Sequence, residues 1–250
     1  MTRPLHIVIP GGSGQVGTML ARHLNAQGHR VTVLTRHKHT APWEVIGWNG
    51  TSIGDWAATL EGADILINLS GRSVNCRYTD KNRAEIKESR TTTTQLLGRV
   101  LSQLARPPRL WMNASTATIY RHAMDRPMDE ANGEIGGAWI HDSDFLRSID
   151  YLIAHEELDG AVNLAAPNPV PNRVFMQALR RAVGAATGLP STRLMLELSA
   201  WFLRTQTELI LKSRRVIPGR LLRSGFNFQF PDWVGAARDL ILRYRARKSK

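Results

Sequence analysis

The sequence contains a single cysteine, Cys76, among its 250 residues. One thiol excludes an intramolecular disulfide and is typical of a protein that works in a reducing compartment. No stretch of about 18 apolar residues is present, so the sequence predicts no membrane-spanning helix. The opening residues MTRPLHIVIP do not resemble a secretory signal, because their short apolar run ends at residues 10–12. We therefore expect a cytoplasmic protein.

Acidic residues are scarce relative to basic ones: 33 lysines and arginines face 21 aspartates and glutamates, which gives a net charge of +12. Such an excess occurs in proteins that bind nucleic acids, anionic membranes or other polyanions. The basic residues are spread along the chain, with local clusters at residues 212–223 and 243–250. No nucleic-acid-binding motif accompanies them. The last cluster is interpreted as a solvated helix end, and nucleic-acid binding is the weakest hypothesis.

Short apolar runs alternate with helical patterns through the first half of the chain. This alternation predicts a parallel sheet with crossover helices, and hence an α/β fold with a Rossmann-type doubly wound sheet. The predicted strands are residues 6–9, 30–34, 63–69 and 110–114, and the predicted helices between them are residues 15–26 and 80–104.

The composition changes at about Gly160. Residues 160–172 contain three prolines and are predicted to form a short strand that enters a loop. Helical patterns follow at residues 173–186 and 194–211. We therefore expect a nucleotide-binding domain over residues 1–158, and a small, mostly helical unit on the substrate side over residues 159–250.

Three regularly spaced glycines, Gly11, Gly14 and Gly17, follow the first predicted strand and begin a predicted helix. In a dinucleotide-binding turn the first glycine permits the tight turn and the second lets the backbone approach a pyrophosphate. The third allows close packing of helix on strand. The first helical amides, those of Gln15 and Val16, then face the phosphates. A plain strand-to-helix turn is the alternative, but the strand–turn–helix context favours nucleotide binding.

The second predicted strand ends near Thr35 and Arg36. An acidic residue at this point would indicate NAD, because it binds the adenosine ribose. Arg36 instead offers a guanidinium to a 2′-phosphate, and His37 and Lys38 add positive potential. The sequence therefore favours NADP over NAD, the alternative being a solvated basic turn. His37 and His39 lack the cysteine or carboxylate neighbours of a metal site, so no metal is expected.

With these residues identified, the chain resembles the extended short-chain dehydrogenase/reductases, the NAD-dependent epimerase/dehydratase family. The glycine spacing has that family's form. Residues 68–71 (NLSG) are similar to its "N-x-A-G" turn, which lies against the cofactor. Residues 115–120 (STATIY) are similar to its "S-S-A-T-V-Y" segment, and residues 138–145 resemble a later "Y-I-H-V-x-D" segment. Residues 193–233 resemble the terminal domain of a branch often called epimerase family protein.

The resemblance implies hydride transfer between a nicotinamide and a carbonyl or alcohol. It places Thr116 at the hydroxyl that hydrogen-bonds the substrate oxygen, and it makes Thr116 the candidate catalytic residue. The implied partner is a small-molecule substrate, and an oligomer is compatible with the sequence. The candidate cofactor-binding residues are Gly11, Gly14, Gln15, Val16, Gly17, Thr35, Arg36, Leu69, Ser70, Gly71 and Ser115.

The family's Tyr-x-x-x-Lys pair, which exchanges a proton as hydride moves, is not at its expected place after the fifth strand. Only Tyr244 with Lys248 fits the spacing, inside the basic tail. Residues 121–138 are too few for the missing helix and strand, since a crossover unit takes about 30 residues. Several dozen residues are therefore expected to be absent near Gly136 and Gly137. They are either lost from the protein or missing between two joined pieces of its chain, and the second is favoured.

Two hypotheses follow. The leading one is an NADP-dependent oxidoreductase or nucleotide-sugar-epimerase-like enzyme. The alternative is a catalytically silent NADP-binding sensor or interaction protein. Ser89, loosely aligned with a family asparagine, is interpreted as a helix-surface serine. His141 and Asp142 are assigned a structural hydrogen-bonding role rather than acid/base chemistry, because adjacent side chains point apart on most backbones.

Overall fold

The computed structural model describes residues 3–74, 76–115, 139–185 and 216–248. Their contacts divide the chain into two compact units, Met1–Ser115 and Thr116–Lys250. Within the described ranges, every helix is too short or too polar to cross a membrane.

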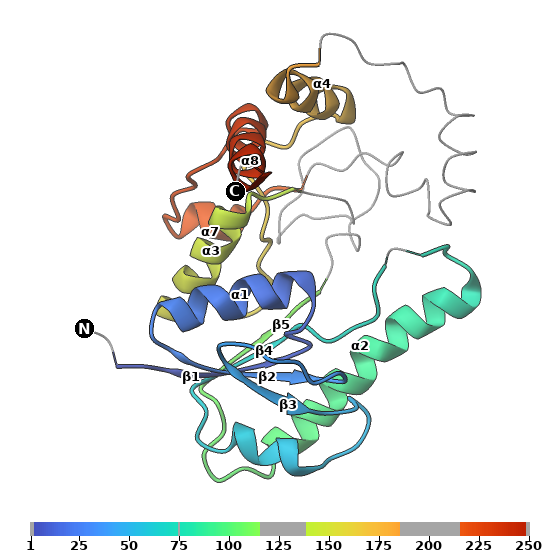
Figure 1. Ribbon diagram of the computed structural model, residues 1–250. Coiled ribbons are helices and arrows are strands. Elements are labelled where there is room, and N and C mark those ends of the chain that lie inside the picture. The colour runs from blue at the N-terminus through green and yellow to red at the C-terminus, as the bar shows by residue number, and fades with distance from the viewer. Residues whose placement is uncertain (1–2, 75, 116–138, 186–215, 249–250) are drawn as a thin grey trace. The chain divides into compact units, whose positions relative to one another are not determined.

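The N-terminal unit is built on a sheet of five parallel strands in the order β3-β2-β1-β4-β5 (Figure 1). The central strand β1 pairs with β2 on one side and with β4 on the other. The chain order reverses between these two neighbours, which is the switch point of a Rossmann-type sheet. The predicted fold class is confirmed. The strands are β1 (His6–Pro10), β2 (Arg30–Thr35), β3 (Glu44–Gly47), β4 (Ile65–Asn68) and β5 (Leu110–Asn113).

Helices cover both faces of this sheet. The helix α1 (Gln15–Ala26) has the predicted bounds, and α2 (Asp80–Leu101) ends three residues before the predicted end. A short 3-10 helix, η1 (Asp55–Leu60), precedes β4. Figure 1 shows α1 and α2 on opposite sides of the sheet. Both faces of the central strands are therefore buried, which explains why these strands read as continuous apolar runs.

The core on the α2 side contains Val8 and Leu66 of the sheet and Leu96 of the helix, all fully buried. Trp48 and Trp56 belong to the same core and make an edge-to-face contact, with 5.2 Å between their ring centroids. Trp48 follows the edge strand β3, which the sequence analysis missed. A four-residue strand is too short to show a clear alternation of apolar and polar residues.

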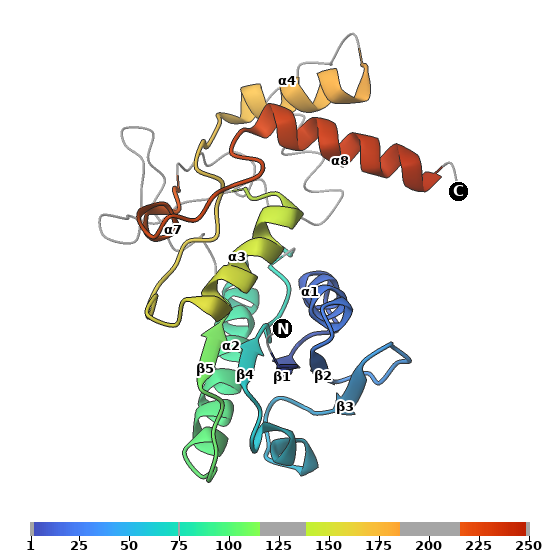
Figure 2. The ribbon, with the colours of Figure 1, turned by 90° about the vertical axis from the view of Figure 1, so that its left-hand side faces the viewer.

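The described part of the C-terminal unit is mostly helical, as predicted. Phe175 stacks on Trp233 at 3.8 Å between ring centroids, and the indole N–H of Trp233 donates to the Phe175 carbonyl (2.9 Å). Figure 2 shows the two helices that carry these residues side by side. The predicted helix at residues 194–211 lies outside the described residues. The helices are α3 (Asp142–Ala154), α4 (Asn172–Val183), α7 (Gly219–Arg223) and α8 (Trp233–Lys248).

The strand predicted after Gly160 was wrong. Residues 160–171 form no strand, and the Ala166 amide makes a single backbone bond there, to the Trp139 carbonyl (2.7 Å). The prolines at 167, 169 and 171 fit the loop that was expected to follow, because each lacks an amide donor.

The contacts divide the chain after Ser115, whereas the sequence predicted a domain boundary after residue 158. The helix α3, which the sequence analysis missed, accounts for part of this difference. Its Tyr151 hydroxyl donates to the Ser224 carbonyl (2.6 Å). Its buried Asp144 accepts from the amides of Gln229 (2.8 Å) and Phe230 (2.7 Å). These bonds join α3 to the C-terminal residues.

Candidate functional site

Two of the three motif glycines are required by the packing of the chain itself. Gly11 has φ +75°, and a Cβ atom on it would lie 2.8 Å from backbone atoms of Ser70. A Cβ on Gly17 would lie 2.5 Å from the Cα of Gly12. Both distances are shorter than real Cβ contacts. Glycine at position 11 therefore lets the loop after β1 pack on the loop after β4, and glycine at position 17 lets α1 pack on the turn that precedes it.

Gly14 is different. Its backbone is ordinary (φ −71°, ψ 171°), and a Cβ there would meet no atom closer than the Gly11 carbonyl oxygen at 3.6 Å. It is the N-cap of α1 and provides no side-chain cap. The first amides of the helix, including those of Gln15 and Val16, therefore have no partner within the helix. Such a start of a helix attracts an anion, and the missing side chain keeps it open.

The end of β2 is tied to the glycine loop. The buried Thr35 hydroxyl donates to the Ser13 hydroxyl (2.8 Å), and the His37 amide donates to the Thr35 hydroxyl (3.3 Å). Arg36 lies between these anchors and is exposed. Among the described residues, none forms a hydrogen bond or ion pair with the Arg36 guanidinium. The turn thus holds an unpaired cation beside the glycine loop.

The loop after β4 is positioned by the buried Asn68. Its Nδ2 donates to the Asn113 Oδ1 (2.7 Å), and its Oδ1 accepts from the Ser70 amide (3.0 Å). The Leu69 amide donates to the Pro10 carbonyl (2.9 Å). These bonds hold the loop beside β1. The Ser70 hydroxyl oxygen is buried and has no hydrogen-bond partner among the described residues.

The structure brings most of the predicted cofactor residues together at the carboxyl-terminal edge of the sheet. They occupy the loop after β1 with the first turn of α1, the end of β2 with the residue that follows it, and the loop after β4. Ser115 lies two residues beyond β5 and is exposed. Thr116 and the expected gap near Gly136 and Gly137 lie outside the described residues, so both stay predictions. The residues gathered at the edge are Gly11, Gly14, Gln15, Val16, Gly17, Thr35, Arg36, Leu69, Ser70 and Gly71.

Ser89 lies on the helix α2 and is partly buried. Its hydroxyl also accepts a hydrogen bond from the Arg72 amide (2.9 Å), so it holds the loop after β4 on α2. The sequence analysis also missed Asn68, although the asparagine of the "N-x-A-G" pattern was a visible signal for it.

A cavity of about 360 Å³ lies at the opposite, amino-terminal edge of the sheet. Three arginines of this region are paired with carboxylates: Arg3 with Asp64, Arg30 with Glu44 and Arg106 with Glu61. The cavity contains none of the glycine, Thr35 or Arg36 features. The candidate cofactor-binding residues therefore lie at the carboxyl-terminal edge, away from this cavity.

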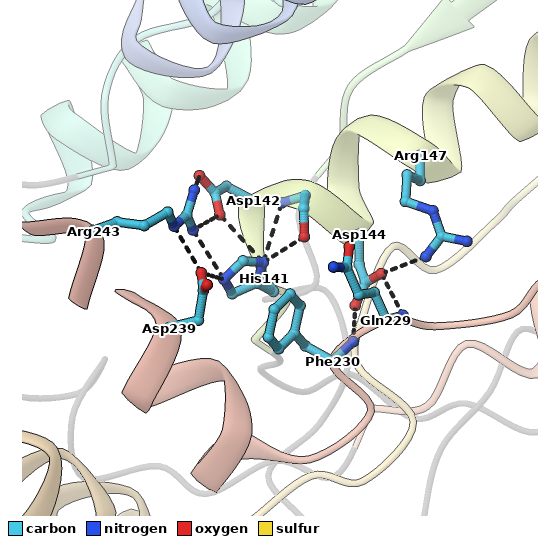
Figure 3. A network of polar contacts seen from close by, with 9 residues as sticks. His141, Asp142, Asp144, Arg147, Gln229, Phe230, Asp239 and Arg243 are labelled. Atoms are coloured by element: carbon cyan, nitrogen blue, oxygen red, sulfur yellow. Dashed lines mark hydrogen bonds and ion pairs between the residues drawn. The ribbon is translucent and has the colours of Figure 1, made fainter. Parts of the chain in front are cut away.

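The C-terminal unit contains a polar network around His141 (Figure 3). The imidazole, only 1% exposed, contacts Ser143 through Nδ1 (2.7 Å) and Asp239 through Nε2 (3.1 Å). The Asp142 carboxylate pairs with Arg243 (2.5 Å), and hydrogen bonding to that guanidinium lowers the pKa of Asp142. Both residues thus take part in the network, and their structural role stays a prediction.

The side chains of His141 and Asp142 do not point apart, contrary to expectation. An Asp142 oxygen lies 3.3 Å from the His141 Nδ1. His141 is the extended N-cap residue of α3, and Asp142 is the first helical residue. This change of backbone conformation allows the two side chains to meet.

Tyr244 and Lys248 both lie on α8. The ammonium group lies 5.0 Å from the centroid of the ring, and Tyr244 is 54% exposed. This arrangement is that of a solvated helix end, as the sequence analysis interpreted it.

Comparison with known families gives two matches. Residues 7–138 match the model of the NAD dependent epimerase/dehydratase family. Residues 193–240 match a domain of unknown function, DUF1731. The second match overlaps the C-terminal segment that resembles the terminal domain of epimerase family proteins.

Individual relatives cover almost the whole chain. Human epimerase family protein SDR39U1 is 23% identical over 95% of this chain and 100% of its own. Epimerase family protein YfhF from Bacillus subtilis is 24% identical over 95% of this chain and 98% of its own. A crystal structure of human SDR39U1 with NADPH has a TM-score of 0.81 at 22% identity, covering 95% of this chain and 99% of that one. The crystal structure of UDP-N-acetylglucosamine 4-epimerase from Bacillus cereus has a TM-score of 0.71 at 14% identity. It covers 96% of this chain and 99% of that one.

The alignment with human SDR39U1 also bears on the expected gap. It spans 300 positions, whereas 95% of this 250-residue chain is about 238 residues. About 60 positions of the alignment therefore have no residue of this chain. This number agrees with the several dozen residues that the sequence analysis expected to be absent.

Proposed function

Because the chain belongs to the NAD-dependent epimerase/dehydratase family, we propose that its N-terminal unit binds NADP. The observation that carries this proposal is the unpaired Arg36 at the end of β2, next to an open helix N-terminus at Gly14. An NAD site has a carboxylate near this point, whereas a guanidinium suits the 2′-phosphate of NADP. The NADPH in the crystal structure of human SDR39U1 supports the same choice.

The residues present fit this cofactor. The open start of α1, with the amides of Gln15 and Val16, would hold the diphosphate. Arg36, positioned through Thr35 and Ser13, would hold the 2′-phosphate. The loop of Leu69, Ser70 and Gly71 lies against Gly11 and would form the neighbouring wall.

We propose that the protein is an NADP-dependent oxidoreductase or a nucleotide-sugar-epimerase-like enzyme that acts on a carbonyl or alcohol of a small molecule. When bound, the cofactor supplies or accepts a hydride. The Thr116 hydroxyl would hold the substrate oxygen. The single cysteine supports a cytoplasmic location.

A second candidate is a catalytically silent NADP-binding protein. About 60 positions of the human relative have no counterpart here, and the described Tyr244–Lys248 pair lies on an exposed helix end. The proton-transfer pair of the family is thus without a replacement among the described residues.

Two measurements test the proposal on the full chain. NADPH binding is followed by nucleotide fluorescence. Turnover is then followed as NADPH oxidation with aldehydes and ketones, and as product formation from nucleotide sugars with NADP⁺, because an epimerisation leaves the redox state of the cofactor unchanged. Saturable binding with turnover supports the enzyme. Saturable binding without turnover of any panel member supports the silent protein. No binding of NADPH contradicts both.

A further inference from the structure

Arg90 lies on α2 directly beneath the loop that follows β4. A Cβ atom on Gly71 would lie 3.1 Å from the Arg90 Cζ and 3.3 Å from its Nε. The guanidinium therefore packs against a residue that has no side chain. Its Nη1 donates to the carbonyls of Ile86 (2.9 Å) and Arg72 (3.3 Å), which fixes its position.

The Arg90 residue is half-buried, yet no carboxylate of the described residues lies within 4.0 Å of its guanidinium. The nearby Glu85 is paired with Arg72 instead. The two carbonyl bonds use only Nη1, so Nε and Nη2 have no acceptor in the described part of the chain. Neither atom is among the buried polar atoms, so a ligand can reach both from solvent. Arg90 therefore has both charge and donors available for an anion.

The surroundings of Arg90 belong to the candidate cofactor site. Gly71, on which it packs, follows Ser70, whose backbone contacts Gly11 of the glycine loop. The adjacent Ser89 holds the same loop through the Arg72 amide (2.9 Å). The Ser70 hydroxyl oxygen, in the same loop, is buried and has no partner among the described residues. A buried polar group without a partner is uncommon unless a water or a ligand completes it.

We propose that Arg90 binds a phosphate group at the carboxyl-terminal edge of the sheet. The planar guanidinium, held by Nη1, presents its remaining donors in a geometry that suits phosphate oxygens. The phosphate belongs either to the dinucleotide or to an anionic substrate, and the two sources share this chemistry. The inference extends the proposed function, since it adds a ligand-binding residue to the proposed NADP site.

The test uses the full chain with Arg90→Gln, and with Arg99→Gln as the matched control. Arg99 lies in the last turn of the same helix and is exposed, so its replacement removes the same charge away from the loop. NADPH affinity is measured by fluorescence titration, and inorganic pyrophosphate is titrated both into the free protein and into the NADPH-saturated protein. Circular dichroism checks folding. Arg90→Lys, which keeps the charge but loses the planar fork, replaces Arg90→Gln if the latter does not fold.

If the phosphate is that of the cofactor, Arg90→Gln weakens NADPH binding about tenfold or more, as expected for the loss of a charged hydrogen bond. Arg99→Gln changes the NADPH affinity little. If it belongs to a substrate, NADPH affinity is unchanged and pyrophosphate binding to the NADPH-saturated protein is lost only in Arg90→Gln. Equal behaviour of both variants and the wild type in every titration overturns the inference.

A wild type that binds no NADPH contradicts the proposed function alone. The pyrophosphate titration of the free protein then decides the role of Arg90. A loss confined to the Arg90 variant supports that role, and equal binding, or no binding, in all proteins overturns it.

Discussion

Gly17 lies so close to Gly12 that a Cβ atom on Gly17 would come 2.5 Å from the Gly12 Cα. Because the obstacle is backbone, Gly17→Ala forces α1 away from its entry turn. We expect a loss of about 1–3 kcal/mol in the free energy of unfolding, as for other overpacked sites. Urea unfolding of the full chain measures this loss. An unchanged midpoint would show that the helix does not pack in this way.

Gly14→Ala is the matched substitution in the same loop. We expect it to affect NADPH binding and not stability. The backbone at Gly14 suits any residue, and the added methyl group meets no protein atom closer than 3.6 Å. We expect an unchanged urea midpoint but NADPH binding at least about tenfold weaker, because the methyl occupies the space where a diphosphate would approach the helix. Unchanged NADPH affinity would remove Gly14 from the site.

Asn68 is expected to contribute to stability through three bonds of its buried amide group. Asn68→Ala leaves the Ser70 amide without its partner and removes one of the two donors to the Asn113 Oδ1, which keeps the Thr94 hydroxyl at 3.1 Å. The expected loss is about 1–3 kcal/mol in the free energy of unfolding. Asn113→Ala is the comparison and should cost less, since the Asn68 Nδ2 keeps the Thr94 hydroxyl at 3.4 Å as an acceptor. Equal losses for the two variants would contradict this account.

The Asp142–Arg243 pair predicts a dependence of stability on acid. Hydrogen bonding to Arg243 holds the pKa of Asp142 below its ordinary value of 3.8. A carboxyl group with a lowered folded-state pKa stabilises the fold above its unfolded-state value, and this stabilisation is lost as the pH falls through the folded-state pKa. Asp142→Asn should therefore reduce the loss of stability below about pH 4 and leave the slope near neutral pH unchanged. Urea unfolding at a series of pH values measures this difference. Identical profiles of stability against pH for the wild type and Asp142→Asn would contradict the prediction.

The N-terminal unit could be predicted from the sequence because its signals are local. The strands β1, β2, β4 and β5 are apolar runs, and the helix after Gly14 is amphipathic. The spacing of Gly11, Gly14 and Gly17, together with the strand before it and the helix after it, indicates the edge of the sheet at which a cofactor would bind. Arg90 could not be found in this way, since its role depends on Gly71 packing against it from another loop.

The C-terminal unit was harder to predict, because long-range bonds hold it together. The position of α3 depends on Asp144, which accepts from the Gln229 and Phe230 amides more than eighty residues away. The spacing of apolar residues along the sequence does not indicate such a hydrogen bond. A short strand was expected to follow Gly160 and to enter a loop, but residues 160–171 form no strand.

The affinity of the full chain for NADPH and for NADH, measured for the wild type and for Arg36→Ala, tests the central claim most directly. Arg22→Ala, at an exposed position of α1, is the control for loss of one positive charge. We expect the wild type to prefer NADPH, and Arg36→Ala to weaken NADPH about tenfold or more while NADH changes little, because only NADPH carries the 2′-phosphate. Equal losses for both nucleotides, or a wild type without preference, would contradict the assignment of Arg36 and of NADP.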